Sequence, residues 1–274
     1  MGKSDVYQSI GGLAPEAQQR IIDRLEFRSH DPVFVAIRES YLDRMDLASA
    51  KRILDLGCGT GVVARALARR IDFEGEIVGV DLSEALIAAA KGFARDEGLS
   101  DRIDFRVGDA QALELAEGSF DVVVTHTLIS HVSDPTALIA QAARVTAPGG
   151  MISIFDGDYS SMTFGAGDPD LNAGVVQGIL DAVVANPVVM RELPDLLGKN
   201  GLEMVDFLPE LHAEAGQGSF FVSLAEAYLP MAVKAGTISE SVAPDWLAAQ
   251  RAASDDGKFF AACNYYTYLA RKPR

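Results

Sequence analysis

A glycine-rich turn is the segment of this sequence best suited to chemistry. In ILDLGCGTG, residues 53–61, an apolar run carries Asp55 and leads into glycine at positions 57, 59 and 61. Asp81 ends the next apolar run, twenty residues after Gly61. Glycine lets the backbone approach a ligand closely because it has no Cβ. A carboxylate at Asp81 can accept both hydroxyls of a ribose at the ends of neighbouring strands. These residues predict a nucleoside site.

The spacing of the glycines and the charge beside them narrow the class of nucleoside. A dinucleotide fingerprint would need glycine at 57, 59 and 62, but residue 62 is valine. Asp55 would repel a pyrophosphate, whereas it suits the ammonium and sulfonium groups of S-adenosylmethionine. Opposite charges about 4 Å apart interact by roughly 4 kcal/mol at an effective dielectric constant near 20. The turn therefore disfavours NAD, and because no Gly-Lys-Ser or Gly-Lys-Thr follows it, a phosphate-binding P-loop is excluded.

The elements that must position this turn are short strands alternating with helices. Five runs rich in valine and isoleucine are each followed by a helical pattern, which is typical of right-handed βαβ crossovers and a parallel sheet. The predicted strands are Arg52–Leu56, Glu76–Val80, Ile103–Val107, Phe120–Thr125 and Met151–Phe155. Open sheets of this kind bind ligands at the carboxyl ends of their strands, where Asp55 and Asp81 lie.

The flanking segments follow other patterns. Helical spacing from Ala14 to Leu47 predicts two helices before the sheet, and Asp134 followed by Pro135 predicts a helix that runs to about Val145. Beyond the fifth strand, the pattern predicts a loop over 157–170, a helix over 173–184, strands over 202–208 and 259–270, and a mostly helical segment over 219–253.

Composition excludes several classes of partner. The chain has 24 Lys+Arg against 39 Asp+Glu, a formal charge of −15, and no dense basic block, so nucleic acid and anionic membrane surfaces are disfavoured. No run of 18 apolar residues and no signal-peptide pattern is present, which predicts a cytoplasmic protein without membrane insertion. Two distant cysteines and four histidines without ligand spacing predict no metal site. Asp156 and Asp158 resemble half of a carboxylate metal site, but they are interpreted as acids that cap a turn at the end of a strand.

Five motifs, in order and correctly spaced, carry a family resemblance over about residues 50–156. They are LDLGCGTG (54–61), VDLS (80–83), VGDA (107–110), FDVVV (120–124) and the segment from Arg144-Val145 to Pro148-Gly149-Gly150. Together they resemble class I S-adenosylmethionine-dependent methyltransferases of the small-molecule type, similar to the ubiquinone and menaquinone C-methyltransferases. The resemblance implies a Rossmann-like α/β fold, a transferase activity and S-adenosyl-L-methionine as cofactor.

The expected fold is a doubly wound, mostly parallel seven-stranded sheet with N-terminal helices and a helical insertion between the last two strands. Residues 1–47 are expected to form a helical flank or lid, and 48–156 the cofactor-binding core. Residues 157–274 would complete the sheet and carry lid insertions at about 157–184 and 216–253.

The resemblance also assigns site residues. It places Gly57, Cys58, Gly59 and Gly61 along the methionine and ribose, Asp55 near the amino group, and Asp81 on the ribose hydroxyls. It places Leu82 on the adenine, Asp109 and Ala110 at the adenine edge, the backbone of Thr125 and His126 at the closing side, and Arg28 at the methionine carboxylate. Cys58 is not expected to act as a nucleophile, because no histidine accompanies it.

The acceptor side is the least specified. His126 and His131 could accept a proton at neutral pH, and His131 is the expected catalytic base because His126 directly follows a strand. An apolar enclosure is expected from Met162, Phe164, Phe220, Phe221, Tyr228, Met231 and Trp246, of which at least half should simply cover the sheet. The charge of −15 favours a neutral or cationic acceptor unless the pocket itself is basic.

The leading hypothesis is a methyltransferase acting on a small hydrophobic or aromatic metabolite. The alternatives are a catalytically silent domain that binds the cofactor as a sensor or partner subunit, and an NAD-linked oxidoreductase. The sequence leaves open the acceptor, the methylated atom and the oligomeric state, a homodimer included.

Overall fold

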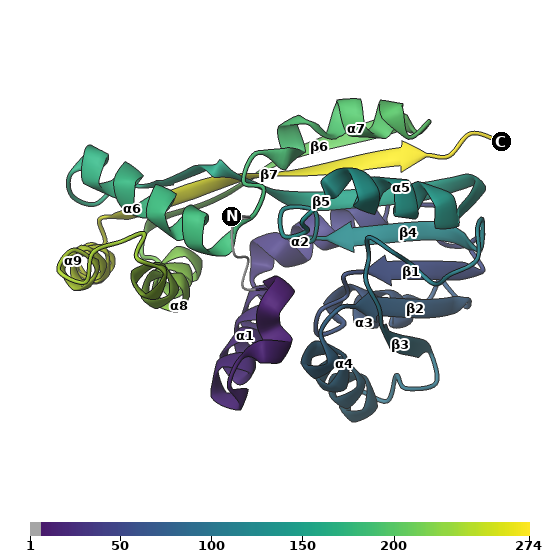
Figure 1. Ribbon diagram of the computed structural model, residues 1–274, viewed down its shortest axis with the longest axis horizontal. Coiled ribbons are helices and arrows are strands. Elements are labelled where there is room, and N and C mark those ends of the chain that lie inside the picture. The colour runs from purple at the N-terminus through teal and green to yellow at the C-terminus, as the bar shows by residue number, and fades with distance from the viewer. Residues whose placement is uncertain (1–6) are drawn as a thin grey trace.

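The computed structural model describes residues 7–274 and contains a seven-stranded sheet in the order β3-β2-β1-β4-β5-β7-β6 (Figure 1). The strands are β1 (Arg52–Leu56), β2 (Glu76–Asp81), β3 (Ile103–Val107), β4 (Phe120–His126), β5 (Thr146–Phe164), β6 (Glu203–Gly216) and β7 (Phe259–Arg271). Strands β1 to β5 pair in parallel, and β7 runs antiparallel to both β5 and β6. The predicted mostly parallel, Rossmann-like sheet is confirmed.

Helices connect these strands. They are α1 (Pro15–Ser29), α2 (Pro32–Leu42), α3 (Val62–Ala68), α4 (Glu84–Asp96), α5 (Pro135–Val145), α6 (Pro169–Val183), α7 (Leu193–Lys199), α8 (Phe220–Ala235) and α9 (Ala243–Asp255), with 3-10 turns at η1 (Tyr7–Gly12) and η2 (Val189–Arg191). Three of them begin alike, at Asp31, Asp134 and Asp168. Each of these carboxylates accepts backbone N–H groups of the first turn and precedes a proline, whose missing N–H costs nothing there.

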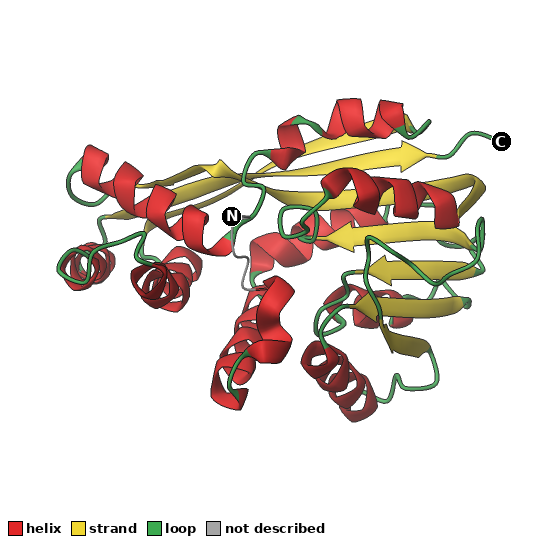
Figure 2. Cartoon of the chain, viewed as in Figure 1, coloured by secondary structure: helices red, strands yellow, loops and turns green. Residues whose placement is uncertain are grey.

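The sheet is covered on both faces, giving three layers (Figure 2). Neighbouring residues of one strand point to opposite faces, so Ile53 packs in one apolar cluster and Leu54 in the other. The first cluster contains buried residues of α2, α3, α4, α6 and α8, and the second those of α5 and α7. Burial on both faces explains why the parallel strands read as continuous apolar runs.

Strand β5 is longer than the sequence predicts. The loop expected over 157–170 is wrong for its first half, because β5 continues to Phe164 and pairs with β7 at Asp158–Asn264 and Phe164–Ala261. The glycine, acidic and serine residues of this segment hide the alternating pattern of a strand. Asp158 can be buried within the strand because Arg191 pairs with it, with 2.8 Å between Nη2 and Oδ1. Strand β6 likewise continues past the predicted Leu208 to Gly216.

The extended ends of β5, β6 and β7 carry the helical insertion. Figure 1 shows α6, α8 and α9 gathered at this end of the molecule, away from α4 and β3. The helical segment predicted between the last two strands is confirmed as α8 and α9. Helix α6 begins at Pro169, four residues before the predicted start, because Asp168 caps it.

The N-terminal flank consists of the two predicted helices, and residues 1–6 of the expected lid lie outside the described residues. Buried Arg65 of α3 binds Glu26 of α1, with 2.6 Å between Nη2 and Oε1. Ile21 and Ile22 of α1 pack with Leu86 of α4. These contacts fix α1 beside the carboxyl ends of the first strands.

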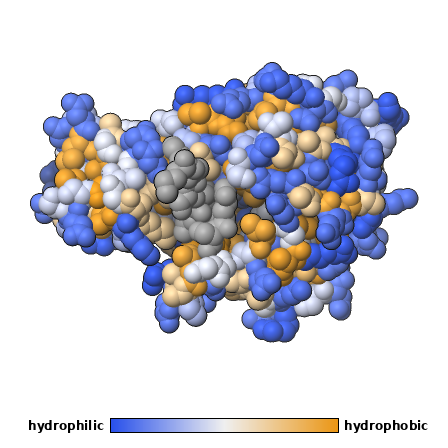
Figure 3. Space-filling model, in the orientation of Figure 1, coloured by the Kyte–Doolittle hydropathy of each residue, from blue (hydrophilic) through white to orange (hydrophobic). Residues whose placement is uncertain are grey.

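The surface view shows a mostly hydrophilic face on which apolar residues form small groups (Figure 3). Within residues 7–274, no helix has both the length and the apolar character needed to span a bilayer.

A buried hydrogen bond between α9 and α6 gives a stability prediction. Trp246 Nε1 donates to Asn172 Oδ1 at 2.7 Å, and both side chains are buried. Trp246→Phe keeps most of the ring but leaves the amide oxygen without this donor, which should lower the free energy of unfolding by about 1–3 kcal/mol. Denaturant titration followed by circular dichroism measures the change, since the variant lacks the chain's one tryptophan. Exposed Asp245→Asn is the control and should change it by less than about 0.5 kcal/mol.

Candidate functional site

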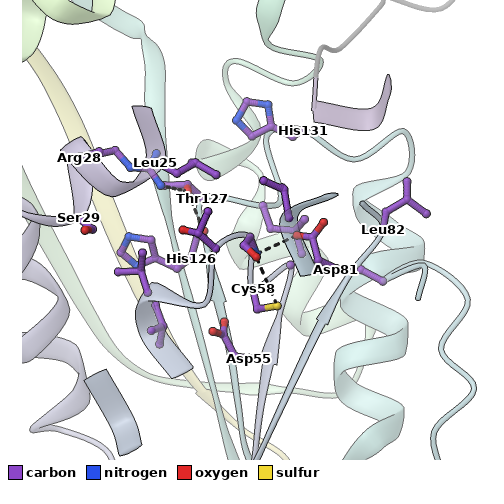
Figure 4. Close-up of a pocket in the computed structure, with 18 of the residues that line it drawn as sticks. Leu25, Arg28, Ser29, Asp55, Cys58, Asp81, Leu82, His126, Thr127 and His131 are labelled. Carbon is purple, nitrogen blue, oxygen red and sulfur yellow. Dashed lines mark hydrogen bonds between the residues drawn. The ribbon is translucent and has the colours of Figure 1, made fainter. Parts of the chain in front are cut away.

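A cavity opens at the carboxyl ends of β1, β2 and β4. The strand order reverses between β1 and β4, because β2 and β3 continue on one side and β5 on the other. Connections leave in opposite directions at such a point and leave a crevice in the sheet edge. The crevice holds about 1110 Å³ of empty space, counting the part open to solvent. We call it the strand-end cavity (Figure 4).

The structure brings all but two of the predicted site residues to this cavity. The predicted residues that line the cavity are Arg28, Asp55, Gly57, Cys58, Gly59, Asp81, Leu82, Asp109, Ala110, His126 and His131. The two exceptions are Gly61 and Thr125, which do not line it. A Cβ at Gly61 would lie 2.6 Å from Cζ of Phe105, so this glycine allows α3 to start against β3. Thr125 is fully buried within β4.

Asp81 organises the glycine turn. Its carboxylate accepts the N–H of Gly59 and the N–H of Ser83, each at 2.9 Å. Burial raises the pKa of Asp81, while these two N–H groups oppose the rise. The oxygens keep lone pairs that can accept further hydrogen bonds. Gly59 needs no side chain for this role, and its φ of +54° is one that glycine adopts without strain.

Asp55 is a buried carboxylate at the floor of the cavity. It is 1% exposed and accepts the Ala64 N–H at 2.9 Å. Burial raises the pKa of Asp55 to about 7, the Ala64 bond opposes this, and the charge of Asp81 adds to it. Among residues 7–274, no cationic side chain pairs with either carboxylate. The cavity therefore has two buried acids whose charge a cationic ligand would complement.

The opposite wall combines an apolar side chain with a polar edge. Leu82 is 51% exposed and lines the cavity beside Ala110. Asp109 accepts the backbone N–H of Gln111 at 2.8 Å, and the Gln111 side chain in turn accepts from Ser133 and from the backbone of Asp134. An exposed leucine next to such an edge suits a flat heteroaromatic ring.

Arg28 of α1 reaches the cavity from the side of the N-terminal flank. Its Nη2 donates to Thr127 Oγ1 at 2.6 Å (Figure 4). Thr127 has a φ of +55°, which is unfavourable for a β-branched residue. Backbone strain of this kind concentrates at functional sites. Thr127 is not among the residues predicted from the sequence, although its place directly after β4, at the ligand edge of the sheet, is a usable signal.

His126 contributes more than backbone to the cavity wall. Its Nδ1 lies 2.9 Å from the hydroxyl of Tyr41, a buried residue of α2. Burial lowers the pKa of His126 well below its ordinary value, and the charges of Arg28 and Arg38 lower it further. The imidazole is therefore neutral at physiological pH and adds no positive charge to the site.

A second cavity lies behind the first, and we call it the inner cavity. The two share Leu25, Arg28 and His131 as lining residues. The inner cavity holds about 550 Å³ of empty space, counting the part open to solvent. Its remaining walls are mostly apolar side chains of α6 and α8, with Tyr159 of β5 and Tyr265 of β7. His131, whose ring lies 6.4 Å from that of Tyr159, stands at the boundary between the cavities.

Three of the predicted enclosure residues line the inner cavity, namely Met162, Phe220 and Tyr228. The others pack in the core, as was expected for at least half of them: Phe164, Phe221, Met231 and Trp246. The cavity also contains Arg24, Tyr159 and Tyr265, which were not predicted, since a helical arginine and strand tyrosines carry no local signal of a cavity.

The surroundings of Asp156, Asp158 and Cys58 favour structural roles for these three residues. Asp156 accepts the backbone N–H groups of Ser130 and Gly157, and Asp158 pairs with Arg191. No group of three potential metal ligands is found within residues 7–274. Burial raises the pKa of the Cys58 thiol well above its ordinary value, which disfavours a thiolate nucleophile.

Curated relatives match the part of the chain that forms this site. A family model described as a methyltransferase domain matches residues 53–150. Methyltransferase GfsG of Streptomyces halstedii is 31% identical over 191 residues, which cover 69% of this chain and 61% of that protein. The ubiquinone biosynthesis O-methyltransferase of Hahella chejuensis is 37% identical over 114 residues, 41% of this chain and 46% of that one. The matches thus span less than two thirds of either relative.

Solved structures share the whole fold at lower identity. A Bacillus halodurans protein aligns with a TM-score of 0.64 at 18% identity, over 86% of this chain and 99% of that one. Phosphoethanolamine N-methyltransferase 2 of Haemonchus contortus, solved with S-adenosyl-L-methionine, aligns with 0.58 at 21% identity, over 92% and 57%. The [4+2]-cyclase SpnF aligns with 0.58 at 21%, over 87% and 81%. Residues 53–150 thus match a methyltransferase domain, and the chain as a whole shares the Rossmann-like fold of these solved structures.

Proposed function

We propose that this protein transfers a methyl group from S-adenosyl-L-methionine to a small, largely apolar molecule held in the inner cavity. The observation that carries the proposal is the pair of buried carboxylates, Asp55 and Asp81, flanking a glycine turn beside a second, apolar cavity. Fold alone is a weak argument, because the same fold serves a cyclase. The chemistry of the two cavities is the stronger one.

The residues at the strand-end cavity fit this cofactor. Asp55 and Asp81 lie where a ligand ammonium, sulfonium and ribose could complement them, and a pyrophosphate would be repelled by the same charges. Leu82 offers an apolar surface for the adenine, and Asp109 a polar edge. Arg28, which lines the cavity, would meet the carboxylate end of the methionine.

When bound, S-adenosylmethionine supplies an electrophilic methyl group on a cationic sulfur. The chain's own task is to orient an acceptor in line with that bond and to exclude water, and orientation can supply several kcal/mol of the barrier. Leu25, Arg28 and His131 form the common wall, so the reacting atoms would meet beside them. His131 is the residue there that can accept a proton from an acceptor O–H or N–H, whereas His126 is a weak base because its pKa is low.

A transfer assay tests the proposal. Purified protein is incubated with methyl-labelled S-adenosylmethionine and a panel of phenols, amines and carboxylic acids, and label in extracted products is counted. Transfer to at least one acceptor is expected. Cofactor binding by calorimetry without transfer to any panel member would favour the sensor alternative, and nicotinamide binding instead would favour an oxidoreductase.

Asp81→Ala should weaken S-adenosylmethionine binding by about 1.5–3 kcal/mol, roughly 10- to 150-fold, because hydrogen bonds to a charged group are lost and the glycine turn loses its anchor. Isothermal titration calorimetry measures the effect. Asp104→Ala, an exposed carboxylate of β3, is the matched control and should bind normally. A folded Asp81→Ala protein with normal affinity would show that the ribose assignment is wrong.

Cofactor affinity should depend on pH through Asp55. Its raised pKa of about 7 means that the free protein carries this carboxyl mostly protonated at pH 5.5, so a cationic ligand must first displace the proton. Affinity for S-adenosylmethionine should rise roughly tenfold from pH 5.5 to 7. Asp55→Asn keeps an acceptor for the Ala64 N–H and should flatten the profile. An unchanged slope in this variant would remove Asp55 from the ammonium site.

His131→Ala should lower kcat about 10²-fold on an acceptor that needs deprotonation, with cofactor affinity unchanged. Initial rates on the acceptor found by the transfer assay, together with calorimetry, separate the two effects. His30→Ala, an exposed histidine at the end of α1, is the control. Near-normal turnover in His131→Ala would leave orientation alone to explain catalysis.

A further inference from the structure

The inner cavity contains a buried arginine that the proposed chemistry does not use. Arg24 of α1 is 9% exposed and lines this cavity. Its Nη1 donates to Ser223 Oγ of α8 at 3.0 Å, and its guanidinium carbon lies 4.6 Å from the centre of the Phe220 ring. Figure 1 shows α1 between α8 and α4, so Arg24 bridges the flank and the insertion.

In the part of the chain that the structure describes, no acid neutralises this guanidinium. Within residues 7–274, no carboxylate lies within ion-pair distance of Arg24, and the hydrogen bond to Ser223 uses one of its five N–H donors. Arg65, the other arginine buried within the described residues, is paired with Glu26. A buried charge without a partner is costly, and neither a neutral hydroxyl nor an aromatic face replaces a carboxylate.

The other polar groups around the inner cavity are also hydrogen-bond donors. Among the described residues, those that line it include no aspartate or glutamate, and the polar ones are Arg24, Arg28, His131, Tyr159, Tyr228 and Tyr265. Guanidinium, phenol and imidazole groups can all donate hydrogen bonds. The strand-end cavity shares Arg28 and also has Arg38, but it adds the three carboxylates of Asp55, Asp81 and Asp109. The two cavities therefore differ in the sign of the charge they favour.

From this arrangement we infer that the inner cavity takes an acceptor with an apolar body and an anionic oxygen group, such as a carboxylate or a phenolate, bound to Arg24. The inference rests on the proposed function only in naming the occupant as the methyl acceptor. The net charge of −15 pointed to a neutral or cationic acceptor unless the pocket was basic. The described lining of the pocket is basic, and a charge in contact outweighs a distant, screened field.

Two probes of equal size separate charge recognition from apolar fit. They are 2-naphthoate and 2-naphthamide, titrated calorimetrically with and without saturating S-adenosylhomocysteine. The wild-type protein should bind naphthoate at least tenfold more tightly than naphthamide. In Arg24→Met this ratio should fall to near one, with naphthamide affinity changed less than about threefold. In Arg24→Lys, which keeps the charge, part of the preference should remain.

Affinity for S-adenosylhomocysteine is the internal control, since Arg24 does not line the strand-end cavity. It should change less than twofold in each variant. Arg24→Gln, which can still donate to Ser223, replaces Arg24→Met if the latter does not fold. A purely structural arginine would lower both naphthalene affinities together and leave their ratio unchanged.

Equal wild-type affinities, a preference retained without the charge, or no naphthoate binding at millimolar concentration would each overturn the inference. The two proposals fail separately. If the protein does not bind S-adenosylmethionine but still prefers naphthoate, only the methyltransferase proposal is wrong. If it transfers methyl groups but does not prefer naphthoate, only the inference of an anionic acceptor is wrong.

Discussion

The carboxylate of Asp81 ties together the parts on which the rest of the site depends. One oxygen holds the N–H of Gly59 in the turn after β1, and the other holds the N–H of Ser83 before α4. Gly57 and Cys58 also donate to the carbonyl of Val80, one residue earlier. The turn after one strand is thus fastened to the end of its neighbour. Because α3 and α4 begin directly after these bonds, their positions follow from the same contact.

The two cavities show how little a total charge says about a site. The chain carries an excess of fifteen acidic charges. The described residues of the inner cavity nevertheless include guanidinium groups and no acid, while the strand-end cavity concentrates carboxylates. Surface charges are screened over about 10 Å in salt solution, whereas groups inside a cavity are not. Local placement by α1 and the strand ends therefore decides which ligand charge each cavity accommodates.

The features that could be predicted from the sequence are those that contiguous stretches of the chain determine. The glycine turn, Asp55, Asp81 and the five parallel strands lie in contiguous motifs whose spacing fixes their geometry, and the structure places them at one edge. The extension of β5 was missed because its partner, β7, is about a hundred residues away and its own composition resembles a loop. Arg24, Tyr159 and Tyr265 were missed for the same reason, since only the packing of distant segments makes them neighbours.

The extension of the sheet also determines when each cavity can form. The residues that wall the strand-end cavity are all present by Val132, whereas those of the inner cavity are complete only at Tyr265 in the last strand. The bond from Arg24 to Ser223 closes a loop of 199 residues, and contacts so distant along the chain form late and slowly. In a chain synthesised from its N-terminus, every residue of the strand-end cavity is thus made before the inner cavity can be complete. A chain shortened by its final strand would keep every residue of the first cavity and lose a wall of the second.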